Sequence, residues 1–191
     1  MVVLAINVRS GGSPAGAERL VERCATHHPD VIVLAEYRDT APGERLRDAA
    51  RRAGFQHQAV TPHRGNGVAI AAREAFESVL NPFGLGDDEY PNAIVLARFA
   101  ALDIFGLYLP GQDRKRPHLR FLTAAAERYN ERGRPAMAIG DFNSGRNESD
   151  IEINVRSGRL ADEFSTADLY AELERYWTEA WLYEHPDAHE Y

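Results

Sequence analysis

The sequence predicts a mixed α and β fold with a central layer of sheet. Short apolar runs that suit buried strands, Val2–Ile6 and Val31–Ala35, are separated by a segment with the apolar spacing of a helix. Segments rich in Gly, Pro and Asn then join further strand-like runs into hairpin-like pairs. The chain is therefore expected to begin with a βαβ-like unit and to continue with hairpins and helices.

The first half of the chain contains clear start and stop signals for two helices. Ser13 followed by Pro14 suits a helix start, and Pro29 lies beyond its expected end. An arginine-rich helix is predicted over Glu44–Ala53, with Gly54 after it. Further strands are expected at Phe55–Val60, Val68–Ala72 and Phe76–Leu80.

The second half is predicted to contain a strand pair, a long helix, another strand and a final helix. Pro117 suits the first turn of the long helix, and Gly133 suits its C-cap. A Ser or Thr ahead of the final helix suits an N-cap. These elements are expected at Ala93–Phe99, Leu102–Leu109, Pro117–Glu131, Pro135–Ile139 and Ser165–Tyr176.

Length and composition indicate one soluble domain. A chain of 191 residues fits a single domain over residues 1–191, with 44% hydrophobic and 27% charged residues. No apolar run approaches the roughly 20 residues that span a bilayer, and the N-terminus lacks the features of a signal peptide. We therefore expect no membrane partner and a cytoplasmic location.

Charge and cysteine content exclude several classes of site. The net charge of −7 argues against broad non-specific binding of nucleic acid, although a local basic rim remains compatible with it. The single cysteine, Cys24, excludes an internal disulfide and a multi-cysteine zinc site. Its place in a helical pattern predicts a buried structural thiol.

One polar stretch, Gly140-Asp141-Phe142-Asn143, directly follows an apolar run. On a strand or its extension, residues two apart point to the same side, so Asp141 and Asn143 are expected to face one spot. A carboxylate beside a carboxamide suits a hard cation or a phosphate. The alternative is an ordinary turn, because Gly, Asp and Asn are common turn residues.

Other apolar strands are also predicted to end in a polar residue. If these strand ends share one rim of the sheets, their side chains converge where active sites commonly lie. The residues concerned are Asn7, Glu36, Tyr108, Asp141 and Asn143.

The same residues lie in motifs that resemble one known family, the endonuclease/exonuclease/phosphatase superfamily. Its members include exonuclease III-like and abasic-site endonucleases, DNase I-like enzymes, sphingomyelinases and inositol polyphosphate phosphatases. The matching motifs, in chain order, are Leu4-Ala5-Ile6-Asn7, the strand Val31–Ala35 with Glu36, Gly65-Asn66-Gly67-Val68-Ala69-Ile70, Leu107-Tyr108-Leu109-Pro110 and Gly140-Asp141-Phe142-Asn143.

This resemblance implies a fold, a reaction and a cofactor. The fold is α+β, a four-layer α/β/β/α sandwich of two packed, mostly antiparallel sheets flanked by helices. The reaction is divalent-metal-dependent hydrolysis of a phosphate ester, of the phosphodiesterase or nuclease type. The implied cofactor is Mg²⁺ or Mn²⁺, and the implied partner is a phosphate-ester substrate, with DNA and RNA among the candidates.

The resemblance also implies a role for each candidate residue. Glu36 would bind the metal, and Asn7 would orient the metal or a phosphate oxygen. Asp141 would position or deprotonate the attacking water, while Asn143 and Tyr108 would donate hydrogen bonds to phosphoryl oxygens. On neighbouring loops, further side chains that could meet phosphates, or else be solvated surface residues, are His63, Arg64 and Arg114.

Some features depart from the family pattern. Ile6 stands where the family often has Trp, and Gly111 where Asn usually follows Tyr-x-Pro. Family members continue with a strand bearing Asp and a terminal Ser-Asp-His, whereas this chain ends at Tyr191. The alternative hypothesis is therefore a truncated or inactive member that acts as a binding or partner-complemented module. The substrate and the oligomeric state stay open, and specificity is expected in loops at 41–43, 81–92 and 144–154.

Overall fold

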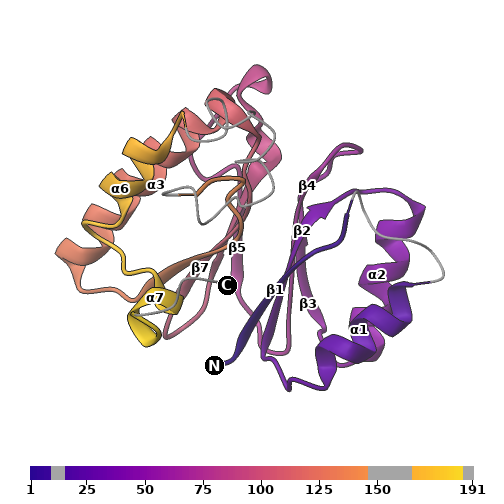
Figure 1. The fold of residues 1–191 in the computed structure, drawn as a ribbon. Coiled ribbons are helices and arrows are strands. Elements are labelled where there is room, and N and C mark those ends of the chain that lie inside the picture. The colour runs from indigo at the N-terminus through magenta and orange to yellow at the C-terminus, as the bar shows by residue number, and fades with distance from the viewer. Residues whose placement is uncertain (10–15, 146–164, 187–191) are drawn as a thin grey trace. The chain divides into compact units, whose positions relative to one another are not determined.

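The computed structural model describes residues 1–9, 16–145 and 165–186 (Figure 1). These residues divide into two compact units. The first unit comprises Met1–Tyr108 and Ala136–Asp141, and it contains both sheets. The second unit comprises Leu109–Pro135 and Phe142–Tyr191. The single domain expected over residues 1–191 stays a prediction.

The first sheet has the strand order β1-β2-β4-β3. Strands β1 and β2 are parallel and are connected through α1, as the βαβ-like beginning predicted. Strand β4 runs antiparallel to both β2 and β3, which confirms the predicted hairpin. The bounds of these elements and of the following helix are β1 (Val3–Asn7), α1 (Ala17–Ala25), β2 (Val31–Tyr37), α2 (Ala41–Arg52), β3 (His57–Val60) and β4 (Gly67–Ala72).

The second sheet has the strand order β5-β6-β7-β8. Its first three strands are antiparallel, whereas β7 and β8 are parallel. The 3-10 turn η1 (Asp87–Glu89) lies within the loop expected at 81–92, and a second turn, η2 (Pro91–Ala93), ends one residue beyond that loop. The strands are β5 (Glu77–Leu80), β6 (Ile94–Arg98), β7 (Asp103–Tyr108) and β8 (Ala136–Asp141).

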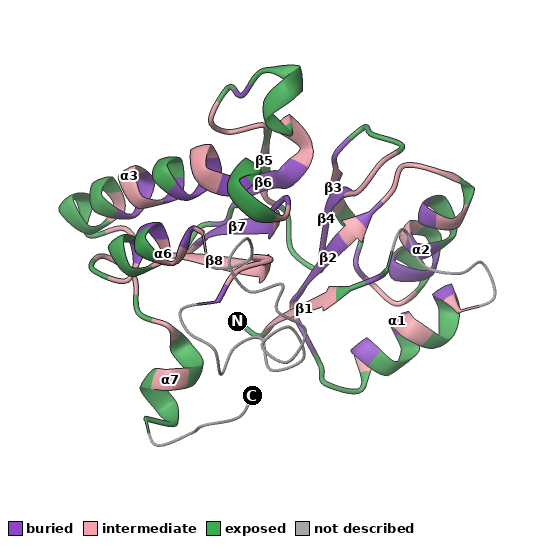
Figure 2. Ribbon diagram, turned by 45° about the horizontal axis from the view of Figure 1, so that its top comes forward, coloured by how far each residue is buried: buried purple, intermediate pink, exposed green. Residues whose placement is uncertain are grey.

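Two hydrophobic clusters lie on the opposite faces of β2 and β4, and these strands are almost entirely buried (Figure 2). Ile32 and Leu34 face the helix-side core, which α1 and α2 complete with Val21, Cys24, Leu46 and Ala49. The alternate residues face the inter-sheet core, formed by Val31, Val33, Ala59, Val68, Ile70, Ala72, Val95, Ala97, Phe99 and Ile104. Burial on both faces explains why these strands are continuous apolar runs rather than alternating ones.

The two sheets approach closely at Gly106 in the middle of β7. A Cβ atom at this position would lie 3.0 Å from both Ile70 Cδ1 and Val33 Cγ1 of the facing sheet. The side chains of β2 and β4 therefore occupy the space that a larger residue would need. This packing confirms the predicted α+β class with two packed, mostly antiparallel sheets.

Helix α2 begins earlier than predicted. Residues 41–43, expected as a loop, form its first turn, with Thr40 as N-cap and Pro42 in the first turn. The early start brings Gly43 against the Tyr37 ring and the Arg38 carbonyl, where a Cβ atom would clash. Helix and strand end are thus packed directly on each other.

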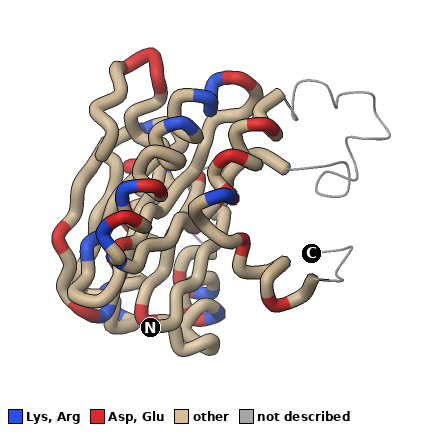
Figure 3. The backbone as a smooth tube through the Cα atoms, turned by 90° about the vertical axis from the view of Figure 1, so that its left-hand side faces the viewer, with Lys and Arg blue, Asp and Glu red and all other residues tan. Residues whose placement is uncertain are grey.

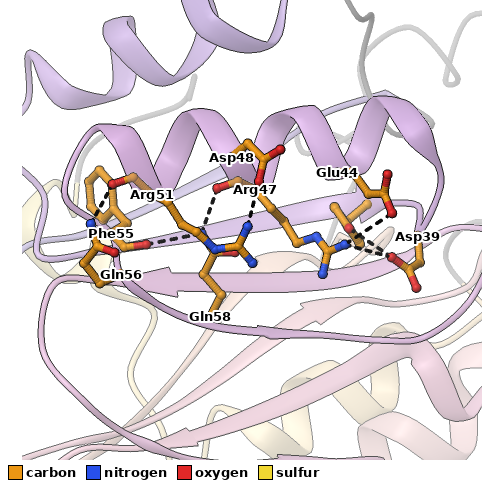
Figure 4. A network of polar contacts seen from close by, with 9 residues as sticks. Asp39, Glu44, Arg47, Asp48, Arg51, Phe55, Gln56 and Gln58 are labelled. Carbon is orange, nitrogen blue, oxygen red and sulfur yellow. Dashed lines mark hydrogen bonds and ion pairs between the residues drawn. The ribbon is translucent and has the colours of Figure 1, made fainter.

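Arg47 of α2 lies in a network of polar contacts that runs along the helix (Figure 4). Its Nη2 pairs with Asp39, 3.5 Å away, in the segment that follows β2. Its carbonyl accepts a hydrogen bond of 2.9 Å from Gln58 Nε2 on β3. One residue therefore links α2 both to β3 and to the segment that follows β2.

The second unit is built on α3 and α6, which pack on each other. Phe142 and Tyr170 meet edge to face with ring centroids 5.7 Å apart, and Asn130 Nδ2 donates to the Tyr176 carbonyl over 2.8 Å. Gly133 ends α3 with φ +61, as its predicted C-cap role requires. The elements are η3 (Gln112–Lys115), α3 (Arg116–Arg132), α6 (Ala167–Leu173) and α7 (Ala180–Glu184).

Most remaining expectations agree with the structure within a few residues. The helix predicted to run to Tyr176 ends at Leu173, and the predicted start at Ser13–Pro14 lies outside the described residues, as does most of the loop at 144–154. Cys24 is buried as predicted, and burial raises the pKa of its thiol. Within the described chain, no helix combines the length and apolar content needed to cross a membrane.

Replacing Gly43 by Ala should destabilise the protein, although Gly→Ala in an uncrowded helix normally stabilises it. The added Cβ collides with the Arg38 carbonyl and the Tyr37 ring, and overpacking of this kind costs about 1–3 kcal/mol. Chemical denaturation measures the change. Gly86→Ala is the control, because a Cβ there has only an ordinary contact, 3.7 Å from Glu89 Oε2. Equal stability of Gly43→Ala and wild type would refute this packing.

Stability should also fall at high pH because of Tyr37. Burial raises the pKa of its phenol from 10.0 to about 12. Below pH 10 the phenol is neutral in both states, but between about pH 10 and 12 the unfolded chain loses the proton more readily than the folded one. Tyr37→Phe should therefore lose about 1 kcal/mol less than wild type between pH 8 and pH 11 in denaturant unfolding. Identical pH dependence of the two proteins would contradict this.

Candidate functional site

Three of the predicted site residues lie at the carboxyl ends of their strands and on the inter-sheet side. In β1, Val3 and Ala5 pack against the inter-sheet core, so Asn7 points to the same side. In β8, Met137 and Ile139 also pack against the inter-sheet core, so Asp141 points to the inter-sheet side as well. Tyr108 of β7 packs against this core itself and is the register partner of Asp141. The strand-end rim expected from the sequence is therefore present.

Glu36 reaches the rim through an irregularity in β2. Because Ile32 and Leu34 face the helix-side core, regular alternation would direct Glu36 into the helix layer. The register instead shifts between Ala35 and Tyr37, and Glu36 adopts a positive φ of 57°. Tyr37 takes the helix-side position and is fully buried. The bulge thus re-aims the carboxylate, a known function of such irregularities.

The Asn7 carboxamide lies between two carboxylates. Its Nδ2 donates to Glu36 Oε1 over 3.0 Å and to Asp141 Oδ2 over 2.7 Å. Its Oδ1 accepts from the backbone N–H of Arg9 over 2.8 Å, which fixes the orientation of the amide. Residues 134 positions apart in the sequence are thereby brought into direct contact.

Gly140 allows the end of β8 to lie close against β7, next to Asp141. Its φ of +141° is one that residues with a side chain rarely adopt, and a Cβ atom would collide with the Leu107 carbonyl of the neighbouring strand. Glycine is therefore required immediately before Asp141. The abrupt change from an apolar run to Gly in the sequence reflects this constraint.

Asn143 belongs to the second unit and is held by contacts within that unit. Its Nδ2 donates to the Leu109 carbonyl over 2.7 Å, and the buried Lys115 ammonium donates to its carbonyl. The prediction that Asp141 and Asn143 share one face of an extended strand was based on a wrong premise. Strand β8 ends at Asp141, and Asn143 has a left-handed φ of 46°, so strand alternation does not apply to it.

Two further residues of the site were not predicted from the sequence: Asn66, which contacts Tyr108, and Arg38, which contacts Asn66. Asn66 Nδ2 donates to the Tyr108 hydroxyl over 3.2 Å, and Arg38 Nε donates to Asn66 Oδ1 over 2.6 Å. Asn66 was visible as part of a Gly- and Asn-rich turn and of the motif Gly65-Asn66-Gly67-Val68-Ala69-Ile70, and neither assigned it a role. Arg38 has no distinguishing signal, because its contact with residue 66 depends on how β2 and β4 are paired.

The three predicted substrate-binding side chains are all exposed. His63 and Arg64 lie in the connection between β3 and β4, where His63 Nδ1 accepts a hydrogen bond from the Gly65 N–H over 3.1 Å. Arg114 lies in η3 of the second unit and donates to the Gly111 carbonyl over 3.3 Å. Their exposure is compatible with phosphate contacts and equally with a solvated surface, so their role stays a prediction.

The donor set of Glu36 and Asp141 fits a hard divalent cation. Across residues 1–9, 16–145 and 165–186, no group of three or more His, Cys, Asp or Glu side chains is placed to bind a metal. Mg²⁺ commonly takes only one or two carboxylates and completes its shell with water and phosphate oxygens. Two carboxylates held by one amide therefore suit Mg²⁺ or Mn²⁺ better than a metal that needs a closed protein site.

The strained backbone at Glu36 predicts an inverted preference between Gly and Ala. A left-handed residue with a Cβ costs about 1 kcal/mol, so Glu36→Gly should be more stable than Glu36→Ala by about that amount. Denaturant unfolding in EDTA measures the difference. At Glu127, inside α3, Ala should instead be the more stable by about 1 kcal/mol. If the Ala variant were more stable than the Gly variant at both positions, the backbone at residue 36 would be unstrained.

Comparison with solved structures supports this architecture. An AP endonuclease from Archaeoglobus fulgidus matches with a TM-score of 0.70 and 18% identity, over 100% of this chain and 77% of that chain. The 3'-5' exonuclease NExo from Neisseria meningitidis matches with a TM-score of 0.71 and 19% identity, over 97% and 75%. The 3' phosphatase NExo from Neisseria, bound to product DNA hairpin, gives 0.69 and 18% over 97% and 74%. These similarities confirm the predicted fold class.

Sequence comparison gives the family. Among curated proteins there is no match. The model of one family, however, aligns with residues 4–188, nearly the whole chain. The resemblance noted in the sequence is thereby confirmed, and the chain belongs to the Endonuclease/Exonuclease/phosphatase family.

Proposed function

We propose that the protein is a divalent-metal-dependent hydrolase of phosphate esters, of the phosphodiesterase or nuclease type. The observation that supports it most strongly is the pair of carboxylates, Glu36 and Asp141, that one Asn7 amide holds together at the ends of strands. Family membership and the nuclease and phosphatase relatives in the structural comparison support the same class of reaction.

Glu36 is the proposed direct ligand of Mg²⁺ or Mn²⁺. When bound, the ion would neutralise the phosphate charge and polarise the P–O bonds. Asn7 acts in this proposal by fixing the positions of the Glu36 and Asp141 carboxylates, since its N–H groups face them and its Oδ1 is engaged by Arg9. A role of Asn7 as a direct metal ligand would instead need its Oδ1, which here accepts the hydrogen bond from Arg9.

Asp141 is the proposed residue that orients the attacking water and accepts its proton. Its carboxylate is fixed at Oδ2 by Asn7 and its backbone is fixed by Gly140, so the group is preorganised. Tyr108, next to Asp141 in the sheet register, would donate its hydroxyl proton to a phosphoryl oxygen. Asn143 is proposed to bind the phosphate through its amide, whose Nδ2 also donates to the Leu109 carbonyl.

DNA is the substrate class that the relatives favour, because one is an AP endonuclease and another was solved with a DNA hairpin. In the described chain, basic residues are interspersed with acidic ones (Figure 3). With a net charge of −7, a nucleic-acid backbone would have to be met by local cations. His63, Arg64 and Arg114 are the proposed contacts, and RNA and small phosphodiesters remain the competing substrates.

The proposal predicts coupled effects of metal on stability and activity. Millimolar Mg²⁺ or Mn²⁺ should raise the melting temperature, by about 2–4 °C for each kcal/mol of binding free energy in a chain of this size. Glu36→Gln should abolish this rise, and Asp141→Asn should reduce it. Both should lower metal-dependent cleavage of abasic DNA, plasmid DNA or bis(p-nitrophenyl) phosphate by at least about 100-fold.

Glu77→Gln is the matched control, because Glu77 is an exposed acid on β5 paired with Arg98. It should keep both the metal-induced shift and the activity of wild type. Failure of wild type to respond to millimolar metal, or an equal response in Glu36→Gln, would overturn the proposed metal site.

A further inference from the structure

Resting on the proposed function, we propose that Asn66 is a positioning residue for Tyr108, and that Arg38 holds Asn66 in the required orientation. The hydrogen bonds run from Arg38 Nε to Asn66 Oδ1, 2.6 Å, and from Asn66 Nδ2 to the Tyr108 hydroxyl, 3.2 Å. Through them the Tyr108 proton is directed toward the phosphoryl group of the substrate. These three residues form what we term the Arg38–Asn66–Tyr108 relay.

The direction of the relay follows from the chemistry of its members. A guanidinium can only donate hydrogen bonds, so Arg38 must face the oxygen of the Asn66 carboxamide. The Asn66 nitrogen then faces Tyr108. The contact with Arg38 thus assigns the orientation of the Asn66 carboxamide, which would otherwise be ambiguous because the flipped amide has nearly the same shape.

The orientation of the Asn66 amide also determines the hydrogen-bonding role of Tyr108. The Asn66 NH₂ group has no acceptor lone pair, so the Tyr108 hydroxyl oxygen must accept. A phenol has one proton, and that proton cannot be shared with Asn66. It is therefore directed away from Asn66, available to a negatively charged oxygen bound beside β7.

The backbone around Asn66 is held firmly, which a positioning role requires. Next to Asn66, the buried Thr61 hydroxyl accepts from the Val68 N–H over 3.1 Å and the Thr61 N–H donates to the Val68 carbonyl over 3.0 Å. A Cβ at Gly67 would collide with that hydroxyl, so only glycine fits at position 67. On the other side, the Asp39 N–H donates to the His63 carbonyl over 2.8 Å.

The Tyr108 end of the relay lies at the strand-end rim that holds the Glu36 and Asp141 carboxylates. Tyr108 and Asp141 are register partners on adjacent parallel strands, so the directed proton emerges at the rim that holds the two carboxylates. The Arg38 charge polarises the Asn66 amide, which strengthens the N–H donation from Asn66 to the Tyr108 hydroxyl oxygen. Arg38 follows Glu36 by two residues, so one strand end supplies both a metal carboxylate and the relay.

The first experiment tests the hydrogen bonds without activity. In metal-free, ¹⁵N-labelled protein, the Asn66 side-chain NH₂ signals can be identified by their loss in Asn66→Asp. They should shift in Tyr108→Phe and in Arg38→Gln, and remain unchanged in Arg98→Gln, whose arginine pairs with Glu77 on the surface. Unchanged Asn66 signals in both relay variants would show that the relay does not exist.

The second experiment is a double-mutant cycle on bis(p-nitrophenyl) phosphate with Mn²⁺. Asn66→Ala should lower kcat about tenfold with KM within about twofold, because the lost orientation matters only in the transition state. In the Tyr108→Phe background, the same change should have no further effect within about twofold. Arg38→Lys should retain more activity than Arg38→Gln, and Asn130→Ala, an exposed asparagine of α3, should match wild type.

The outcomes separate this inference from the function on which it rests. If wild type is active and depends on Glu36, but Asn66→Ala is fully active or additive with Tyr108→Phe, then the positioning role is wrong and the proposed hydrolase stands. If no substrate is cleaved, the proposed function fails and the catalytic role of the relay fails with it. The NMR result then still decides whether the hydrogen bonds exist.

Discussion

The rest of the candidate site depends on one interaction, the double donation from Asn7 Nδ2 to Glu36 and Asp141. The two carboxylates come from different sheets, and like charges so close together repel each other. One amide nitrogen offsets part of this repulsion and ties the sheets together at their rim. A divalent cation would neutralise what remains, and this is why we propose metal binding as the role of the arrangement.

The position of Glu36 depends in turn on the packing behind it. Tyr37 occupies the helix-side position that regular alternation would give to Glu36, and it fits only because Gly43 of α2 has no side chain. Arg47 secures α2 to the segment after β2 through Asp39. The strained φ of Glu36 is thus maintained by the buried contact between Tyr37 and Gly43 of α2. Structure behind the rim, rather than at it, sets where the proposed metal ligand points.

Strand alternation explains how much of this was predictable. Asn7 and Asp141 each follow, at a spacing of two, apolar residues that face the inter-sheet side. Their convergence with Tyr108 could therefore be inferred from the sequence. Glu36 could not be placed by the same rule, because a bulge leaves no pattern in a run such as Val31–Ala35. Asn143 was misjudged for the opposite reason, since extended backbone was assumed where the chain turns. Asn66 and Arg38 were missed because only strand pairing brings them together.

The central claim is that the paired carboxylates form a cation site. Anomalous diffraction from a crystal soaked in MnCl₂ tests it most directly. The account predicts a manganese peak within bonding distance of the Glu36 carboxylate, at about 2.0–2.3 Å, with Asn7 still in contact with both acids. Manganese bound elsewhere, with the Glu36 and Asp141 carboxylates unchanged and metal-free at saturating concentration, would contradict it.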